Sequence, residues 1–388
     1  MSILFTNVTA VTMDPENPVL KDAFVAVEGN KIASIGDQRP DGEFERVIDC
    51  GGKVMLPGFV NAHTHVPMTL MRGYGGGCDL HTWLNQYIFP AEARLDDRCV
   101  AAGAALGLAE MIASGTTCIA DMYMNTETIA QTVLDAGISA NLSCGAVYFG
   151  DPADFSPETC NDCGNHVRLY ENWHGAGDGQ LLVDASIHAE YTSCPPAWEW
   201  VADFAQKHNL RMHVHVSETL SEHEKCVDKY GKTPAALLDQ YGVWQNGGIA
   251  AHCVYLSGGD AELFAKRGVT AVHNPVSNLK LMSGVAPLFF LRECGMSVAL
   301  GTDGVASNNS HNMFEEMKTA ALVQNHSFGE DHGLLQAADI LAMATVNGAR
   351  ALGRDTGVIA PGKIADLILV DLTAPNLFPC HDIMEDLV

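Results

Sequence analysis

The chain has 388 residues, of which 47% are hydrophobic and 18% are charged, and its formal net charge at pH 7 is −25. A surface this acidic repels phosphate backbones, so nucleic acid is excluded as an expected partner. The sequence contains neither the roughly 18 consecutive apolar residues of a membrane helix nor, at its start, a basic segment followed by an apolar core, which predicts a cytoplasmic protein without membrane contact. The twelve cysteines are scattered, as is typical of reduced thiols in that compartment.

Both ends of the chain predict β-strands. Residues 3–13 and 23–35 are rich in β-branched side chains, and the second run is interrupted by the hairpin turn signal EGNK at 28–31. Near the other end, the turn signal PGK at 361–363 precedes a predicted strand over 365–372. These strands flank a long central region with a different pattern.

The central region alternates short apolar runs with segments of helical length. The predicted strands cover residues 54–60, 116–121, 140–147, 182–188, 211–216, 248–252, 270–273 and 297–301. The predicted helices cover residues 96–114, 128–136, 195–208, 233–241, 260–267, 287–294, 313–326 and 335–352, and many are followed by a glycine that suits a C-terminal cap. This alternation predicts an α/β fold with a parallel sheet, and eight units predict a closed (β/α)8 barrel; a doubly wound open sheet is the alternative. The polar, glycine-rich segment 149–179 is expected to cover the barrel mouth.

Several predicted strands end in residue types that bind metal ions. Active sites of such barrels lie at the C-terminal ends of the strands. The residues at these ends are His63 and His65 after the first strand, His188 on the fourth, His213 and His215 on the fifth with Glu218 beyond it, His252 on the sixth and Asp303 after the eighth. Residues two apart in an extended chain face the same side, so His63 and His65 can reach one ion.

Each of these residues has a plainer interpretation when it is taken alone. A His-x-His sequence also occurs where histidine caps a strand, Asp303 could cap a turn, and His188 could be a core residue. The joint pattern, with ligand types at the ends of strands one, five and eight, favours a metal site. Imidazoles combined with one carboxylate suit Zn²⁺, Fe²⁺ or Mn²⁺, and strand four offers no lysine to bridge a second ion, so one ion is expected.

An ion of this kind lowers the pKa of a bound water to about 7. Asp303 could bind the ion and accept a proton from that water. Glu218 lies just past strand five, where it could protonate a ring nitrogen of a substrate, and His252 could orient the attacking hydroxide. The residues therefore predict metal-assisted hydrolysis at a ring carbon.

The first of these motifs also carries a family resemblance. The run PGFVNAHTH at 57–65 resembles the opening signature of the amidohydrolase superfamily. Within it, the chain resembles the 5-methylthioadenosine/S-adenosylhomocysteine deaminases, through the runs HVPMTLMRG at 65–73, WL at 83–84, PAE at 90–92, HVSET at 215–219, AHCV at 251–254, HNPVSNLKL at 273–281 and LGTDGVASNN at 300–309. The likeness extends from about residue 3 to residue 388. It is more specific for the superfamily than for the branch, since triazine hydrolases and guanine or cytosine deaminases are close relatives.

The resemblance implies a two-part architecture. A distorted TIM barrel is expected over residues 57–356, beside a small β-sandwich formed by residues 1–56 and 357–388. Members of the group usually continue for a few more strands, so the sandwich is expected to be incomplete. Barrels of this kind often pair, which makes a homo-oligomer one expected state.

The resemblance also assigns roles to individual residues. It implies that one divalent metal, zinc before iron or manganese, is bound by His63, His65, His215 and Asp303. The residues implied to contact a purine nucleoside are Glu218, His252 and Ser307 at the adenine ring, Glu92 at the ribose hydroxyls, Trp83 near the sugar or 5′ group, and His188. Because a free base has no ribose, Glu92 marks the nucleoside branch; the alternative is a surface carboxylate at a helix end.

The chain departs from the group where a 5′ substituent is expected. Members that bind the carboxylate of homocysteine use two arginines, one just after strand three and one in the following loop. Cys144 stands where the first arginine is expected and Asp162 about where the second is, while Arg168 is out of register. A buried carboxylate without a cationic partner is costly, so a neutral 5′ group is favoured over S-adenosylhomocysteine.

Three functions follow as alternatives. The first is hydrolytic deamination of adenine in a nucleoside or thionucleoside, such as 5-methylthioadenosine, 5′-deoxyadenosine or adenosine, to the inosine analogue. The second is deamination or dechlorination of a free heterocycle such as guanine, a pterin or a triazine. The third is a non-catalytic barrel scaffold; such relatives lose their metal ligands, whereas every ligand is present here.

Overall fold

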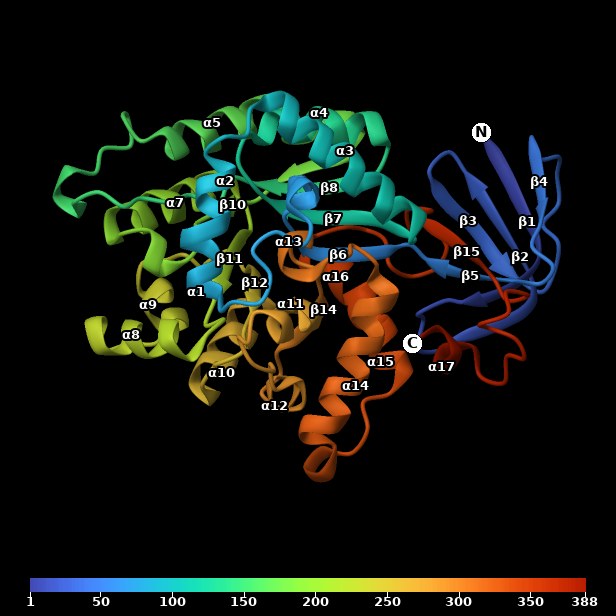
Figure 1. Cartoon of the computed structure of the whole chain (residues 1–388). Helices are drawn as coiled ribbons and strands as arrows, with labels where there is room; N and C mark the ends of the chain where they lie inside the picture. The colour runs from blue at the N-terminus through green and yellow to red at the C-terminus, as the bar shows by residue number, and fades with distance from the viewer.

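The computed structural model describes residues 1–388, and its larger part is a barrel of parallel strands surrounded by helices (Figure 1). The barrel strands are β6 (Phe59–Thr64), β7 (Thr116–Met122), β8 (Ser139–Ser143), β9 (Leu181–Val183), β10 (Ala185–Ser186), β11 (Met212–Val216), β12 (Gly248–His252), β13 (Val269–His273) and β14 (Ser297–Leu300). They form two parallel sheets, β6-β7-β8-β9 and β10-β11-β12-β13-β14. Because β9 and β10 are consecutive pieces of one strand interrupted at Asp184, the barrel has eight strand positions.

Hydrogen bonds at two junctions close these sheets into the barrel. The Asp303 N–H, after β14, donates to the carbonyl of His63 in β6 at 3.0 Å, and Thr64 and Asp303 form a parallel bridge. At the other junction the His188 N–H donates to the carbonyl of Ala146 at 3.0 Å. The predicted α/β barrel is confirmed.

Helices follow the strands in chain order and cover the outside of the barrel. They are α3 (Asp97–Ala113), α4 (Thr126–Ala136), α5 (Asn161–Trp173), α7 (Pro195–His208), α8 (Leu220–Tyr230), α9 (Pro234–Gln240), α10 (Gly258–Arg267), α12 (Leu288–Glu293), α14 (Met313–His332), α15 (Ala337–Ala344) and α16 (Val346–Ala351). Shorter helical segments are η1 (Val66–Met71), α1 (Leu80–Trp83), η2 (Leu84–Ile88), α2 (Phe89–Glu92), η3 (Pro152–Asp154), α6 (Ala176–Gly179), η4 (Glu190–Thr192), α11 (Pro275–Lys280) and α13 (Val305–Asn308). None of the helices combines the length and the apolar character that crossing a membrane requires.

A second sheet stands beside the barrel, at the right of Figure 1. Its strands are β1 (Ser2–Val11), β2 (Val19–Glu28), β3 (Lys31–Gly36), β4 (Arg46–Asp49), β5 (Lys53–Pro57) and β15 (Leu367–Asp371), in the order β15-β5-β1-β2-β3 with β4 also paired to β1. Strands from both ends of the chain meet here, since β15 pairs antiparallel with β5. The sheet has its own core, a cluster of eight buried residues that includes Val8, Val25 and Ile32. The last element is α17 (Ile383–Leu387).

Two predicted elements are each divided in the structure. The predicted strand 54–60 is split between β5, which joins the second sheet, and β6. Gly58 lies between them, and a Cβ at this position would be 2.2 Å from Oγ1 of Thr117, so glycine is required. The predicted helix 335–352 is α15 and α16, because Thr345 has φ −133° and ψ −93°, which no helix accommodates.

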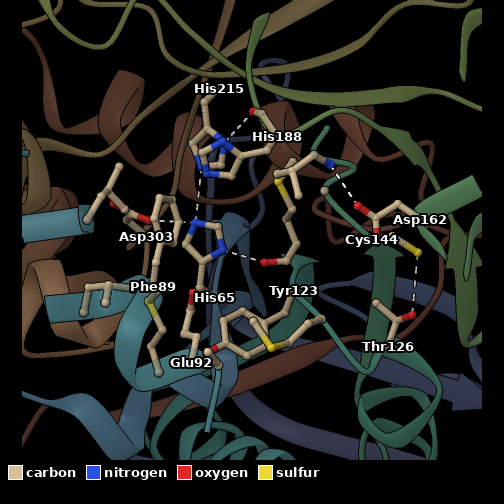
Figure 2. A pocket seen from close by; sticks show the side chains of 18 of the residues that line it. His65, Phe89, Glu92, Tyr123, Thr126, Cys144, Asp162, His188, His215 and Asp303 are labelled. Carbon is tan, nitrogen blue, oxygen red and sulfur yellow. Dashed lines mark hydrogen bonds and ion pairs between the residues drawn. The ribbon is translucent and has the colours of Figure 1, made fainter. Parts of the chain in front are cut away.

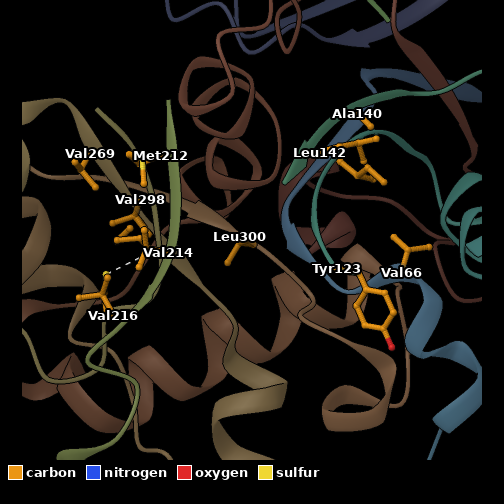
Figure 3. Packing of buried hydrophobic residues seen from close by; sticks show 14 of the residues in the cluster. Val66, Tyr123, Ala140, Leu142, Met212, Val214, Val216, Val269, Val298 and Leu300 are labelled. Carbon is orange, nitrogen blue, oxygen red and sulfur yellow. Dashed lines mark hydrogen bonds between the residues drawn. The ribbon is translucent and has the colours of Figure 1, made fainter. Parts of the chain in front are cut away.

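Two buried apolar layers stabilise the barrel. The larger, a cluster of 69 residues, lies between the strands and the helices and includes Met212, Val214 and Val216 of β11 (Figure 3). The smaller is a cluster of ten residues, most of them from five strands around the barrel, and it fills the interior. Because side chains alternate along a strand, His213 and His215 of β11 face that interior.

A β-bulge in β6 turns two further histidines inward. Val60 and Ala62 belong to the interior cluster, so strict alternation would point His63 towards the helices. The pairing of β6 with β7 instead shifts by one residue just before Thr64. The extra residue reverses the alternation, which is how His63 and His65 both reach the interior.

The closing junction generates a prediction about stability. A Cβ at Gly301 would be 2.8 Å from N and 2.9 Å from O of His63. We expect Gly301→Ala to lower the free energy of unfolding by about 2 kcal/mol, because the two backbones must separate. In the control variant Gly329→Ala, within α14, a Cβ meets only Leu334 at 3.9 Å, and stability should rise by roughly 0.5–1 kcal/mol. Urea denaturation measures both; a Gly301→Ala protein as stable as the wild type would contradict the tight junction.

Candidate active site

The four predicted metal ligands converge at the C-terminal end of the barrel. Figure 2 shows His65 between His215 and Asp303. Nε2 of His65 is 3.2 Å from Oδ1 of Asp303 and 3.2 Å from Nε2 of His215. Nε2 of His63 is 3.5 Å from the same Asp303 oxygen. Buried donor atoms from β6, β11 and the loop after β14 therefore face a common point.

Backbone carbonyls fix the orientation of two of these imidazoles. Nδ1 of His65 faces the carbonyl of Met122, and Nδ1 of His215 lies 2.8 Å from the carbonyl of His188. A carbonyl only accepts, so each Nδ1 carries a proton, and each Nε2 is the ring nitrogen directed at the common point. Burial lowers the pKa of His215 well below its usual range, which keeps this imidazole neutral, as a metal ligand must be.

The third imidazole supplies the test of whether these residues fit a metal. Nε2 of His63 is buried and has no hydrogen-bond partner. Leaving a buried polar atom unpaired costs roughly 1–3 kcal/mol, so a bound group is expected there. Three imidazole nitrogens and one carboxylate oxygen suit a zinc ion. The donor set therefore fits the single divalent ion that the sequence predicts.

Asp303 is held as a charged carboxylate by several short contacts. Its Oδ2 accepts from the hydroxyls of Ser277 at 2.6 Å and Ser307 at 3.0 Å, and its Oδ1 accepts from the Gly304 N–H at 2.8 Å. Burial alone would raise the pKa of Asp303. Its contacts with His63 and His65 outweigh this effect and hold the pKa well below its usual range. The carboxylate is thus both oriented and ionised.

Ser307 lies four residues after Asp303, in α13. Its hydroxyl contacts both Oδ2 of Asp303 and the carbonyl of Gly304, the latter at 2.9 Å, so it helps to orient the carboxylate. Its side chain is not among those that line the cavity beside the ligands. Its predicted contact with the adenine ring stays a prediction.

A second acid and a further histidine face the ligands. Oε2 of Glu218 is 3.7 Å from Nε2 of His252, and the Ser283 hydroxyl donates to Oε1 of Glu218 at 2.9 Å. Nδ1 of His252 lies 2.8 Å from Oδ1 of Asn278, which fixes the ring. Burial raises the pKa of Glu218, which favours a carboxyl that can hold and release a proton. Ser283 and Asn278 had no predicted role, because only the fold brings them to these two side chains.

These groups line a cavity of about 470 Å³, a size typical of small-ligand sites. The predicted residues that line it are His65, Trp83, Glu92, His188, His215, Glu218, His252 and Asp303. His63 lies deeper, behind the wall. The predicted cover segment contributes Phe149, Asp162 and Asn165 to the wall, the last two from the first turn of α5.

Glu92 is a buried member of this cavity. Its side chain lies at the end of α2 and is 8% exposed, which excludes the alternative of a surface carboxylate. Burial raises its pKa, and a contact with the Tyr123 hydroxyl partly offsets this. A carboxylate in this place can accept hydrogen bonds from hydroxyl groups of a bound molecule.

The far end of the cavity carries no positive charge. Figure 2 places Thr126, Cys144 and Asp162 together, away from Asp303. Burial raises the pKa of the Cys144 thiol to about 12, so it is neutral at pH 7. Oδ2 of Asp162 accepts from the Val147 N–H at 3.0 Å. None of the residues that line the cavity is Lys or Arg.

The comparisons with known proteins agree with this geometry. A profile of the amidohydrolase family matches residues 54–387. The chain belongs to the amidohydrolase family. A 5′-deoxyadenosine deaminase of Methanosarcina acetivorans is 41% identical over 386 residues, covering 100% of this chain and 88% of the relative. A 5-methylthioadenosine/S-adenosylhomocysteine deaminase of Caldanaerobacter subterraneus subsp. tengcongensis is 42% identical over 389 residues, with the same two coverages.

Two solved structures share the whole fold. An adenosine deaminase from Xanthomonas campestris with bound zinc superposes with a TM-score of 0.93 at 35% identity, covering 100% of this chain and 88% of that one. A guanine deaminase from C. acetobutylicum superposes with a TM-score of 0.89 at 22% identity, covering 100% and 94%, a likeness of fold alone. The predicted family resemblance is confirmed.

The ligand geometry predicts which side chains control metal content. His215→Ala removes one of four donors, so we expect the purified variant to lose most of its bound metal on dialysis. Glu218→Gln is the matched control, since Glu218 lines the same cavity but supplies no ligand, and its metal content should equal that of the wild type. Inductively coupled plasma mass spectrometry measures both, and full metal content in His215→Ala would contradict the assigned ligand set.

Proposed function

We propose that this amidohydrolase catalyses the hydrolytic deamination of the adenine ring in a nucleoside with a small neutral 5′ group, giving the inosine analogue and ammonia. The observation that carries the proposal is the presence of buried Glu92 in the same cavity as Glu218 and three of the proposed metal ligands, His65, His215 and Asp303. The names of the relatives support this proposal, because they are 5′-deoxyadenosine and 5-methylthioadenosine/S-adenosylhomocysteine deaminases. A cytoplasmic location and a homo-oligomer stay predictions.

The chemistry follows from how the side chains are placed. His63, His65, His215 and Asp303 would hold the zinc ion, which would lower the pKa of a bound water to about 7. Asp303 accepts a proton from the attacking water. His252, whose ring is fixed by Asn278, orients the resulting hydroxide. The water oxygen adds to C6 of adenine, while the proton held by Glu218 passes to the ring nitrogen N1.

Loss of the amine completes the reaction. Glu218, now a carboxylate, takes the proton of the C6 hydroxyl and passes it to the departing nitrogen, so the C6–N bond breaks, C6 keeps a carbonyl oxygen and ammonia leaves. The proton on Asp303 then returns to Glu218 for the next turnover. The Ser283 hydroxyl bonds one oxygen of Glu218 and leaves the other beside His252, so this carboxyl can transfer a proton without losing its position. The inosine analogue remains in the cavity as the product.

The sugar end of the cavity supports a particular 5′ group. Glu92 accepts hydrogen bonds from the ribose hydroxyls, and Trp83 and His188 line the wall beside the sugar. Beyond them, the neutral thiol of Cys144 and the carboxylate of Asp162 offer no partner for an anion. Arg168 does not line the cavity: its Nε is 3.6 Å from Oε1 of Glu127, and its guanidinium donates to Oδ1 of Asn165. A methylthio or deoxy group fits this wall, whereas the carboxylate of S-adenosylhomocysteine does not.

A free heterocycle is the second candidate class. An atrazine chlorohydrolase of Arthrobacter aurescens has the same fold, with a TM-score of 0.92 and 24% identity. At this identity the likeness concerns the fold alone. Buried Glu92 has no partner on a free base, and this favours the nucleoside. Two buried groups of possible ligands, His63 with His65 and Asp303 and His63 with His215 and His252, disfavour a non-catalytic scaffold.

A substrate comparison tests the proposal. We expect the zinc-loaded enzyme to convert 5-methylthioadenosine and 5′-deoxyadenosine, with kcat/KM for S-adenosylhomocysteine at least about 100-fold lower, because an unpaired buried carboxylate costs several kcal/mol. Loss of adenine absorbance and release of ammonia measure turnover. Activity on guanine or a triazine with none on any adenine nucleoside would contradict the proposal, and equal use of S-adenosylhomocysteine would contradict the neutral 5′ group.

The role of Glu92 is tested with a matched pair of substrates. Glu92→Ala should lower kcat/KM for adenosine by roughly 10- to 100-fold, the usual worth of a hydrogen bond to a charged group. For 2′,3′-dideoxyadenosine, which lacks both ribose hydroxyls, the same variant should match the wild type. Steady-state kinetics on both substrates decide the point, and an equal loss on the two would assign Glu92 to something other than the ribose.

A further inference from the structure

One of the three ligand imidazoles lacks the backbone carbonyl that fixes the other two. Nδ1 of His63 lies 2.7 Å from Nε2 of His213 instead. An imidazole nitrogen can donate or accept, so this contact alone allows two proton arrangements. In one, His63 carries its proton on Nδ1 and presents a lone pair to the metal site. In the other, Nε2 of His63 carries the proton and can bind no metal.

The far side of His213 selects between the two arrangements. Its Nδ1 is 3.2 Å from Oγ of Ser143, and this Oγ is also 3.2 Å from the carbonyl of Asp121. The carbonyl only accepts, so the single hydroxyl proton of Ser143 goes to Asp121, and Oγ must accept from the Nδ1–H of His213. Nε2 of His213 is then an acceptor and receives the proton on Nδ1 of His63. The lone pair on Nε2 of His63 follows from this sequence of bonds.

We infer that His213 and Ser143 are positioning residues that hold His63 in its metal-binding tautomer. The reverse arrangement would place an N–H at Nε2 of His63, where Oδ1 of Asp303, at 3.5 Å, is too distant for a normal hydrogen bond. Histidine ligands ordinarily donate their second N–H to a carboxylate, a backbone carbonyl or water. Here the acceptor is the buried imidazole of His213. The row of hydrogen bonds from His63 through His213 and Ser143, called the relay below, ends at the backbone carbonyl of Asp121.

Burial and strand geometry support the relay. His63, His213 and Ser143 have no exposed surface, so water does not compete for their hydrogen bonds. His213 and the ligand His215 are two residues apart on β11, and one strand therefore supplies both a ligand and the support for another.

The test compares two variants of similar length that differ in the acceptor. His213→Gln retains an oxygen that can accept from Nδ1 of His63, whereas His213→Met does not. Loss of a residue that hydrogen-bonds to a metal-binding histidine usually weakens metal affinity by about 10- to 100-fold. We therefore expect the dissociation constant for zinc to rise by that factor in His213→Met. In His213→Gln it should stay near the wild-type value. Competition with a chelator of known affinity measures it. The inference rests on the metal site and not on the substrate, so its failure is distinct from a failure of the proposed deamination.

Two further variants test whether a change in zinc affinity comes from general disturbance of the core. Ser143→Ala removes the acceptor for His213 while keeping the ring, and it should also weaken zinc binding. His273→Met is the control for burial, because His273 is an equally buried histidine whose ring nitrogens bond to nothing, and its zinc affinity should equal that of the wild type. Equal zinc affinity in the wild type and His213→Met would overturn the inference. So would a loss in His213→Gln as large as in His213→Met, since shape rather than the acceptor would then be responsible.

Discussion

The chemistry of this protein depends on ligand nitrogen atoms buried at the end of the barrel, one of which has no hydrogen-bond partner. Nε2 of His63 has no partner within the chain, and it lies beside Nε2 of His65 and the carboxylate of Asp303. Such an arrangement is unfavourable unless a cation completes it. The fold therefore holds a donor set that is satisfied only when the metal that the reaction requires is present.

The backbone hydrogen bonds that close the barrel also orient the metal-binding side chains. The Asp303 N–H donates to the carbonyl of His63, so the junction between β14 and β6 fixes two ligands relative to each other. On the opposite side, the carbonyl of His188 orients the imidazole of His215. The absence of a side chain at Gly301 permits the first of these contacts. Stability at the two junctions and geometry at the metal site thus have the same physical origin.

The sequence predicted the strand order and the residues at the strand ends, because apolar runs, glycine caps and ligand types are local signals. The strand 248–252 has the predicted bounds, and it ends at His252 as expected. The bulge that turns His63 inward, the positioning role of Ser307 and the relay through His213 could not be predicted. Each depends on register or on contacts between strands that are distant in the chain, which alternation within one segment does not reveal.

The account is tested most directly by X-ray absorption at the zinc K-edge of the purified, zinc-loaded protein. We expect a shell of five nitrogen and oxygen atoms at about 2.0–2.2 Å, four from the protein and one from the bound water, with the outer-shell scattering of three imidazole rings and no sulfur. The chain contains twelve cysteines, so thiolate ligation is a real alternative. A sulfur shell at about 2.3 Å, or a shell without imidazole scattering, would contradict the convergence of His63, His65, His215 and Asp303 on one ion.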